Sequence, residues 1–474
     1  MRIRQESWPN QSFNWRQLPI WLAYHVRWLN VYTDLQWIEA VQLLPRESIE
    51  KVQRDKLKNL LLHAAANVPY YQRVLREASV VNDQEVTLSN FARIPPLNKE
   101  IIRREKQNLF SRVMDQDGWV KNTSGGSTGE PVELIQDKTY CDMDSANKLY
   151  WRKMLGKKHG DREVMLWGSE RDILGLKESW RVRARNFLIN LVVLNAFMMS
   201  QGTMERYVEK INELKPVIIY SYLDSAYELA KHIKRNNLKI FSPKSIIVTA
   251  GRAHPVIKEF IGNIFRCPVY NQYGSREAGD MAVECPERKG LHVFEYLYFF
   301  EILDEGLSPV KPGEVGEVYV TVLMNYAMPL IRYKIGDTAS WIGRECTCGR
   351  HTRLIQDVHG RIIDHFRRKD GTIIFGDYFT HLFYFRPWVR RFQVVQRDYD
   401  LVECNVALEH EADPADLKDI TYKIKKVMGD QCQVSFKFVT EVLPSRSGKY
   451  LYTICELANE SIRRNEDLTG PINP

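Results

Sequence analysis

The sequence lacks the features that mark several classes of protein. Its 474 residues contain only eight cysteines, too few for a fold built on disulfides. The longest mainly apolar run, at 187–199, is too short to span a bilayer and contains two asparagines. The first residues form no apolar signal core, and neither an internal repeat nor a low-complexity tract is present. These absences favour a globular cytoplasmic protein.

A large excess of charge of one sign is also absent. The chain has 67 Lys and Arg against 59 Asp and Glu, a formal net charge of +8, and no basic block long enough to act as a nucleic-acid-binding arm. We therefore expect no nucleic-acid partner, whereas a small acidic substrate suits a mildly basic chain. With 44% hydrophobic and 11% aromatic residues, the chain is long enough and apolar enough for two or three folded domains.

Tryptophan, in contrast, is concentrated near the N-terminus, at positions 8, 15, 21, 28 and 37. The stretch 18–32 predicts a helix with an aromatic-rich face. Such a face packs on the rest of the domain or on a partner. The alternative is peripheral contact with a membrane surface.

The order of predicted elements indicates the fold class. After a helical region from about 50 to 115, short β-rich runs at 162–168, 215–223, 244–251 and 267–274 alternate with helical segments. That alternation predicts βα units and a mainly parallel sheet. From 291 onwards the pattern changes to apolar–polar alternation, at 291–303, 313–323 and 329–337, which is typical of antiparallel strands.

The C-terminal part looks separate. Strands are predicted at 390–396, 401–409 and 431–442, with a helix at 412–429 that has acidic residues at its start and basic residues at its end. We therefore predict an α/β protein. Its large N-terminal domain, residues 1–363, combines βα-type sheets with an antiparallel β-subdomain, and a small α+β domain occupies residues 364–474.

One short stretch has the composition of a phosphate cradle. Residues 122–131, NTSGGSTGEP, are rich in glycine and hydroxyl side chains, which let backbone N–H groups approach phosphate oxygens. The stretch lacks the Walker A lysine and does not fit G-x-G-x-x-G. On composition alone, a flexible surface loop and a cradle both remain open.

Four further motifs follow this stretch in order: NQYGSREAG at 271–279, PLIRYKIGD at 329–337, GRIID at 360–364 and SRSGKY at 445–450. Together the five resemble the adenylate-forming superfamily, whose members activate a carboxylate with ATP. Segments 60–75, 93–104 and 329–337 are similar to the phenylacetate–CoA ligase-like branch, which includes proteins attributed to capsular polysaccharide biosynthesis. The resemblance implies an AMP-forming ligase with ATP and Mg²⁺ as cofactors, a carboxylic acid substrate, and an acyl acceptor that is coenzyme A or an amine.

The resemblance also implies site residues. Thr128 and Glu277 would hold Mg²⁺, and Asp337 would bind the ribose hydroxyls. Lys449 would be catalytic together with Thr128 and Glu277. The full set implied for ATP or AMP binding is Ser124, Gly125, Gly126, Ser127, Thr128, Gly129, Gly251, Arg252, Ala253, Asn271, Tyr273, Gly274, Asp337, Arg361 and Lys449.

Asp364 is the implied hinge, about which a mobile C-terminal domain would bring Lys449 to the nucleotide. The acid itself is expected near 167–172, 221–225 and Tyr273. Two departures from the family pattern, Glu130 and Arg276, motivate an alternative: a catalytically reduced homologue that serves as a scaffold in polysaccharide or conjugate biosynthesis.

The cysteines suggest a separate metal site. Cys285, His292, Cys346 and Cys348 supply three thiolates and one imidazole, a closed tetrahedral set suited to structural Zn²⁺. The spacing is not that of a standard zinc finger, and four reduced, unligated residues are the alternative. Similar Cys and His pairs in the resembling branch favour zinc. The remaining cysteines are expected to pack as small hydrophobic residues.

Overall fold

The computed structural model describes residues 29–82, 85–113, 118–123, 132–168, 180–251, 253–356, 358, 365–383, 386–442 and 452–458. The expected helix at 18–32 falls almost entirely outside these ranges. So do the Gly/Ser segment from Ser124 to Pro131, Arg252, Arg361, Asp364 and Lys449. Within the described ranges, no helix has both the length and the apolar character needed to cross a bilayer.

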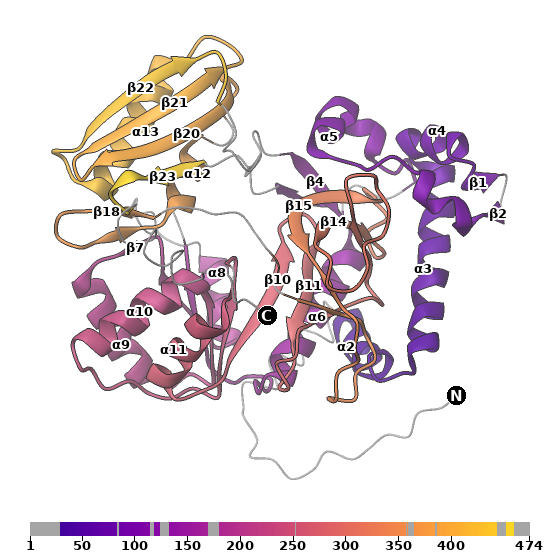
Figure 1. The fold of residues 1–474 in the computed structure, drawn as a ribbon, viewed down its shortest axis with the longest axis horizontal. Coiled ribbons are helices and arrows are strands. Elements are labelled where there is room, and N and C mark those ends of the chain that lie inside the picture. Colours follow the sequence, from indigo (N-terminus) through magenta and orange to yellow (C-terminus); the bar gives the residue numbers. More distant parts are fainter. Residues whose placement is uncertain are drawn as a thin grey trace, which may run out of the picture.

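The N-terminal helices form one side of the molecule (Figure 1). They are α2 (Leu29–Val41), α3 (Arg46–Asn67), α4 (Pro69–Glu77) and α5 (Lys99–Glu105). Pro69 occupies the first turn of α4, where its missing N–H costs no hydrogen bond, so the chain breaks between α3 and α4. The side chain of Asn98 caps α5 by accepting the Ile101 N–H at 2.9 Å.

A nine-stranded sheet forms the centre, in the order β16-β17-β12-β11-β10-β9-β8-β5-β6. Its parallel part comprises β5 (Glu163–Trp167), β6 (Leu191–Asn195), β8 (Ile218–Tyr222), β9 (Ser245–Thr249) and β10 (Val269–Ser275). Its antiparallel part comprises β11 (Gly279–Glu284), β12 (Leu291–Val293), β16 (Trp341–Ile342) and β17 (Leu354–Ile355). The predicted parallel sheet is therefore confirmed.

Helices cover this sheet. In the region of residues 180–265 they are α8 (Trp180–Leu188), α9 (Gln201–Leu214), α10 (Leu223–Arg235) and α11 (Pro255–Phe265), which lie together in Figure 1. Helix α6 (Lys138–Met154) packs against α2 and β11. The hairpin of β3 (Val120–Thr123) and β4 (Glu133–Gln136) precedes α6 and flanks the undescribed Gly/Ser segment.

A three-stranded antiparallel sheet of β13 (Tyr298–Leu303), β14 (Gly316–Val322) and β15 (Tyr333–Ala339) forms the predicted β-subdomain. Two boundaries were predicted wrongly. The run at 291–303 splits into β12 and β13, because a turn closed by the Leu297 N–H on the Phe294 carbonyl interrupts it. Strand β15 starts later than 329, because the buried Arg332 has a left-handed backbone and donates to the carbonyls of Ala92 and Ile94.

The C-terminal part has the predicted β-β-α-β order. Strands β20 (Val389–Asp398), β21 (Leu401–Leu408) and β22 (Gln433–Val439) and helix α13 (Pro414–Met428) match the expected segments, and β23 (Thr453–Cys455) adds an edge strand parallel to β20. Helix α12 (Gly376–Phe383) packs on α13 and β20.

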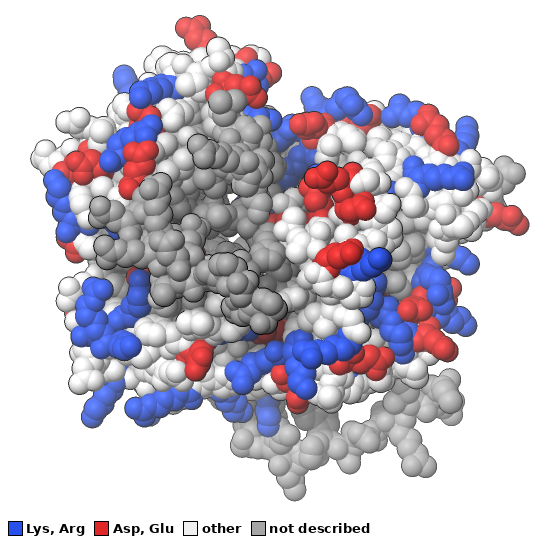
Figure 2. Space-filling model, in the orientation of Figure 1, with Lys and Arg blue, Asp and Glu red and all other residues white. Residues whose placement is uncertain are grey.

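A smaller sheet joins the C-terminal part of the chain to the large domain. Strands β18 (Phe366–Arg367) and β19 (Ile373–Ile374) pair with β7 (Met198–Met199) from the large domain. The hydrophobic core beneath is shared as well, since the rings of Phe197 and Tyr378 are in contact and belong to one buried cluster. The division at 363/364 stays a prediction, but the C-terminal part clearly packs on the large domain (Figure 1). On the face in Figure 2, acidic and basic side chains are interspersed over the described parts.

Candidate active site

The hairpin from β10 to β11 positions most of the predicted nucleotide residues that are described. Asn271, Tyr273 and Gly274 lie on β10, and Glu277 lies at the tip, where the Ser275 hydroxyl accepts the Ala278 N–H at 3.1 Å. An added Cβ on Gly274 would lie 2.7 Å from the carbonyl oxygen of Gly279. Only glycine fits there without displacing the backbone, so the hairpin can keep its close turn.

Tyr273 and Asp337 meet at the inner side of this hairpin. The Tyr273 hydroxyl donates to Asp337 Oδ2 at 3.0 Å, which joins β10 to β15. The Tyr273 ring also stands edge-on to Phe300, at 6.5 Å between ring centroids. Asp337 is only half-buried, so its carboxylate has room to accept further hydrogen bonds.

Glu277 has a cationic partner that the sequence motifs did not assign. Lys99 Nζ lies 3.1 Å from Glu277 Oε1, and the side chains are 8% and 9% exposed. Lys99 is the first residue of α5. The preceding Leu97 hydrogen-bonds through its backbone to Arg332 and Lys334, so the lysine is fixed to the chain beside β15. A lysine at the start of a helix is usually solvated, so the segment 93–104 did not indicate this ion pair.

The beginning of the Gly/Ser segment lies next to the same hairpin. The Asn122 side-chain amide donates to the backbone carbonyl of Arg276 at 3.1 Å. Thr123 is the last described residue of β3 before the segment begins. Asn122, at the entry to the predicted phosphate loop, therefore contacts Arg276, the residue directly before Glu277 on the hairpin.

Gly251 and Ala253 follow the end of β9, as expected for residues at the carboxyl edge of a parallel sheet. An added Cβ on Gly251 would lie 3.0 Å from a methyl group of Leu223, and Ala253 is fully buried. The backbone N–H of Asn271 donates to Glu284 Oε2 at 2.6 Å. The structure therefore brings Tyr273 and Asp337 together, places Glu277 at the tip of the same hairpin, and sets Gly251 and Ala253 after β9, the parallel neighbour of β10.

A partly buried polar cluster that sequence reasoning missed lies between α6 and β11. The Trp151 indole N–H donates to Asp280 Oδ2 at 2.9 Å, and Lys148 Nζ lies 2.6 Å from Asp144 Oδ2. Burial raises the pKa of Asp144, and Lys148 offsets this only in part. Because i,i+4 charge pairs are common on helices, the sequence alone did not distinguish the Asp144–Lys148 pair from a solvated pair.

Aromatic residues from two of the segments expected to bind the acid are in contact. The ring of Trp167, at the end of β5, stacks on Tyr222 at 4.2 Å and on Tyr220 at 5.4 Å between centroids. The Tyr220 hydroxyl donates to Gln272 Oε1 at 3.0 Å, which ties this group to β10. Residues 169–172 of the same expected region lie outside the described ranges.

The four predicted zinc ligands converge. Cys285 follows β11, His292 lies on β12, and Cys346 and Cys348 lie in the loop between β16 and β17. Their ligand atoms all lie within 4.8 Å of one another. Cys285 Sγ is 3.6 Å from Cys346 Sγ, and Cys348 Sγ is 3.3 Å from His292 Nε2. Three sulfurs and one imidazole nitrogen at this spacing fit a tetrahedral Zn²⁺ ion.

The surroundings of this cluster orient its ligands. His292 Nδ1 pairs with the Thr352 hydroxyl at 3.0 Å, which leaves Nε2 facing the sulfurs. Burial raises the pKa of Cys285 to about 12. For Cys348, burial acts in the same direction, but hydrogen bonds with His292 and Arg350 outweigh it and lower the pKa to about 5. One thiolate is therefore favoured without any ion.

Comparisons with known proteins agree with this picture. A family model described as the CapK C-terminal domain matches residues 366–456. The protein CapK of Staphylococcus aureus is 23% identical over 89% of this chain and 93% of its own length. The phenylacetate-coenzyme A ligase of Thermus thermophilus is 27% identical over 66% of this chain and 71% of its own. A solved structure of 2-hydroxyisobutyryl-CoA ligase, in complex with 2-HIB-AMP and CoA, has a TM-score of 0.58 at 19% identity and covers 90% of this chain and 94% of that one.

The fold is that of the adenylate-forming ligases. Within that class, the relatives by sequence are CapK and phenylacetate–CoA ligases, so the resemblance drawn from the five motifs is confirmed. The similarity to phenylacetate–CoA ligases agrees with the prediction of an AMP-forming ligase of that type.

Proposed function

We propose that this protein activates a carboxylic acid with ATP and then transfers the acyl group to coenzyme A. In the first step, a carboxylate oxygen bonds to the α-phosphorus of ATP while the bond to pyrophosphate breaks. In the second, the sulfur of the acceptor bonds to the acyl carbon and AMP leaves. The observation that carries the proposal is that one hairpin brings Tyr273 to Asp337, carries Glu277 at its tip, and contacts Asn122 at the entry to the Gly/Ser segment.

The nucleotide would lie along the β10–β11 hairpin, beside β15. Asp337 would accept hydrogen bonds from the two ribose hydroxyls, because a carboxylate offers only acceptors to a diol. Residues lining the nucleotide would be Gly251, Arg252, Ala253, Asn271, Tyr273 and Gly274, and residues holding its β- and γ-phosphates would be Ser124, Gly125, Gly126, Ser127, Thr128 and Gly129. Backbone N–H groups in such a loop suit phosphate oxygens.

Mg²⁺ would be held by Thr128 and Glu277, and when bound it would neutralise phosphate charge. The Glu277 carboxylate is the type of ligand that this hard cation prefers. Lys99 already pairs with the Glu277 carboxylate, so Mg²⁺ and Lys99 would share this one acidic group. Lys99 is then suited to bind phosphate oxygens as well, as a compact positive charge.

The C-terminal domain, from residue 364, would supply Lys449 to the α-phosphate and the acid carboxylate, where negative charge develops in the transition state. Arg361 would reach the ribose or the phosphates. Asp364 would be the hinge about which the domain turns between the two steps.

The cysteine and histidine cluster would hold Zn²⁺ with a structural role. Its four ligands would fill a tetrahedral shell, so no coordination position would remain for a substrate. The ion would fix the loop between β16 and β17 to the end of β11.

The acid would bind beside Trp167, Tyr220 and Tyr222, since this aromatic group is hydrogen-bonded to β10 through Gln272. Coenzyme A is the first candidate for the acceptor, because the ligases named above carry CoA in their names or as a bound group. An amine acceptor would give an amide instead.

The test measures pyrophosphate release with a panel of acids, with CoA and amines added in turn. Activity with at least one acid, lost in Asp337→Ala and Lys449→Ala, supports the proposal. Thioester or amide formation then identifies the acceptor. ATP binding without adenylate formation for any acid would favour the scaffold alternative.

A further inference from the structure

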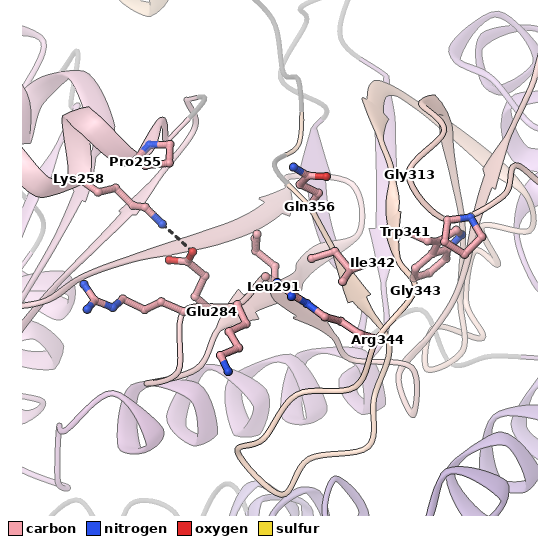
Figure 3. Close-up of a pocket in the computed structure, with 14 residues that line it drawn as sticks. Pro255, Lys258, Glu284, Leu291, Gly313, Trp341, Ile342, Gly343, Arg344 and Gln356 are labelled. Carbon is pink, nitrogen blue, oxygen red and sulfur yellow. Dashed lines mark hydrogen bonds and ion pairs between the residues drawn. The ribbon is translucent and has the colours of Figure 1, made fainter. Parts of the chain in front are cut away.

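A cavity lies on the far side of Glu284 from the Asn271 N–H that this residue accepts. It has a volume of about 540 Å³ and opens between the first turn of α11, the turn from β11 to β12, and the β16 segment (Figure 3). None of the described residues predicted to bind nucleotide lines it. Its size is in the range of small-molecule pockets.

Basic side chains dominate this cavity. Lys258, Arg288, Lys289 and Arg344 line it, against the single carboxylate of Glu284. That carboxylate is already engaged, because Lys258 Nζ lies 2.6 Å from Oε1, as drawn in Figure 3, and Oε2 accepts the Asn271 N–H. Lys and Arg side chains gather on the molecular face between α11 and α2 (Figure 2).

Three of these cations have no acidic partner to offset them. Arg288, Lys289 and Arg344 are exposed, and among the residues that the structure describes none of them pairs with a carboxylate. The cavity therefore carries an excess of positive charge at its mouth, which attracts an anion.

The two turns that carry these cations are held rigidly together. Gly290 has φ +136°, and an added Cβ there would lie 2.5 Å from Ile342 Cδ1, so the turn after β11 packs directly on β16. Cys285 and Cys346, on the same two turns, bring their sulfurs to 3.6 Å. The two turns are thus positioned by packing, which reduces the part of the entropy cost of binding that comes from the backbone.

The floor of the cavity is apolar. Leu291, Trp341 and Ile342 line it, so a ligand that fills the space would present an apolar or aromatic part there. Guanidinium groups favour phosphate because their N–H groups bind two oxygens at once. We propose that this cavity binds a small organic phosphate, with its phosphate at Arg288, Lys289 and Arg344 and its organic part over Leu291, Trp341 and Ile342.

Such a ligand would act on the strand that carries the predicted nucleotide residues. A phosphate near Lys258 competes with Glu284 for that cation, and Glu284 holds the Asn271 N–H on β10. The cavity is also linked to the hairpin by aromatic contacts, since Trp341 stands edge-on to Phe300, and Phe300 edge-on to Tyr273. The cavity therefore contacts the strand that carries the predicted nucleotide residues, although none of the described ones among them lines it.

The experiment uses the full chain and isothermal titration calorimetry at low salt. The probes are adenosine 3′,5′-bisphosphate, uridine diphosphate and inorganic phosphate, each titrated alone and with saturating α,β-methylene-ATP. We expect at least one organic phosphate to bind more tightly than inorganic phosphate. In Arg288→Glu/Arg344→Glu its Kd should rise about tenfold or more, since two charge-assisted contacts are reversed. The matched control is Arg206→Glu, an exposed arginine of α9, for which Kd should stay unchanged.

Three outcomes would overturn the proposal: equal affinity of the double variant and the parent, binding of organic phosphates no tighter than that of inorganic phosphate, or complete displacement by the ATP analogue. The last would assign the probe to the nucleotide site. If the double variant lacks a cooperative thermal transition, Lys289→Glu is judged by the same criterion, with a weaker Kd required.

Discussion

Lys99 Nζ and Glu277 Oε1 form an ion pair of 3.1 Å between two side chains that are less than a tenth exposed. The pair joins the start of α5 to the tip of the β10–β11 hairpin. Breaking such a pair leaves the other charge without compensation, so both residues should matter for the site that they share.

We predict that Glu277→Gln lowers the rate of pyrophosphate release by about 100-fold, because it removes the carboxylate proposed to hold Mg²⁺ at the reacting phosphates. Lys99→Met should lower it by about tenfold, with Lys99→Arg recovering part of the loss. Initial rates at saturating ATP measure both effects. Rates in Lys99→Met equal to those of the parent would exclude a role for the lysine in the reaction.

Substitutions of Asp337 and Tyr273 should differ in how far they raise KM for ATP. Asp337→Ala removes the predicted ribose acceptor, so we expect KM for ATP to rise by about 10- to 100-fold with a smaller change in kcat. Tyr273→Phe removes only the hydroxyl that donates to Asp337, and should raise KM by about tenfold or less. Steady-state kinetics with varied ATP distinguish the two. A larger effect for Tyr273→Phe than for Asp337→Ala would contradict the assigned roles.

The metal cluster gives a prediction that does not depend on activity. Purified protein should contain about one zinc per chain, and Cys285→Ser or Cys346→Ser should lower this content. We expect Tm to fall by about 5 °C or more on chelation, because each kcal/mol shifts the Tm of a domain by about 2–4 °C. Cys141→Ser is the matched control, since Cys141 lies on α6 away from the cluster. Metal analysis and thermal melts read out both effects, and zinc-free protein with an unchanged Tm would reject the assignment.

The sequence predicted the features that follow from local pattern. The parallel strands were recognisable because buried strands such as β8 and β9 are almost uninterrupted apolar runs bounded by helices. The four predicted zinc ligands could be grouped by residue type, since Cys and His in that number suit one metal, and the structure places them in one cluster. In both cases the chemistry of the residues restricts the structure without any knowledge of the tertiary fold.

The features that the sequence did not predict depend on contacts between segments that are distant in the sequence. The partner of Glu277 could not be read from Lys99, because a lysine in a helix is usually solvated. The late start of β15 depends on the burial of Arg332 against the carbonyls of Ala92 and Ile94. The pairing of β7 with β19 joins two-residue strands whose sequences carry no periodic signal.

Glu295 provides a test of stability against pH. It is fully buried and accepts from the Arg353 backbone N–H at 2.8 Å and the Arg353 guanidinium at 2.6 Å, as well as from Arg46. Burial alone would raise the pKa of Glu295, but Arg353 and Arg46 outweigh it and hold the pKa below its usual 4.5.

Because the folded-state pKa is lowered, the stabilisation by Glu295 is fully present above pH 4.5 and is lost as pH falls through the folded value. We expect Glu295→Gln to cost about 2 kcal/mol at pH 7 and less at pH 3. Glu317→Gln is the control. The side chains of Glu317 and Lys334 are each 40% exposed, so their ion pair should contribute little to the free energy of unfolding. Urea unfolding at both pH values measures the difference, and a pH-independent cost would refute the linkage.

The last prediction concerns the pairing of β7 with β19, which connects the large domain to the segment just after the predicted hinge. Met198 lies directly opposite Ile374 in this antiparallel pair. His365 Nε2 lies 3.0 Å from Asp224 Oδ2 on α10, and the Phe375 N–H donates to the Phe197 carbonyl at 3.0 Å. If the C-terminal domain turns as one unit from residue 364, all of these contacts must break between the two steps.

Cross-strand neighbours are close enough for a disulfide, so Met198→Cys/Ile374→Cys should form one on oxidation. We expect the oxidised double variant to lose one of the two half-reactions by about 100-fold while keeping the other, because a fixed domain positions Lys449 for only one geometry. Reduction should restore both rates. Each single variant and the oxidised parent serve as controls for the native thiols. If both half-reactions survive cross-linking, β18, β19 and α12 stay with the large domain, and the hinge lies C-terminal to residue 383.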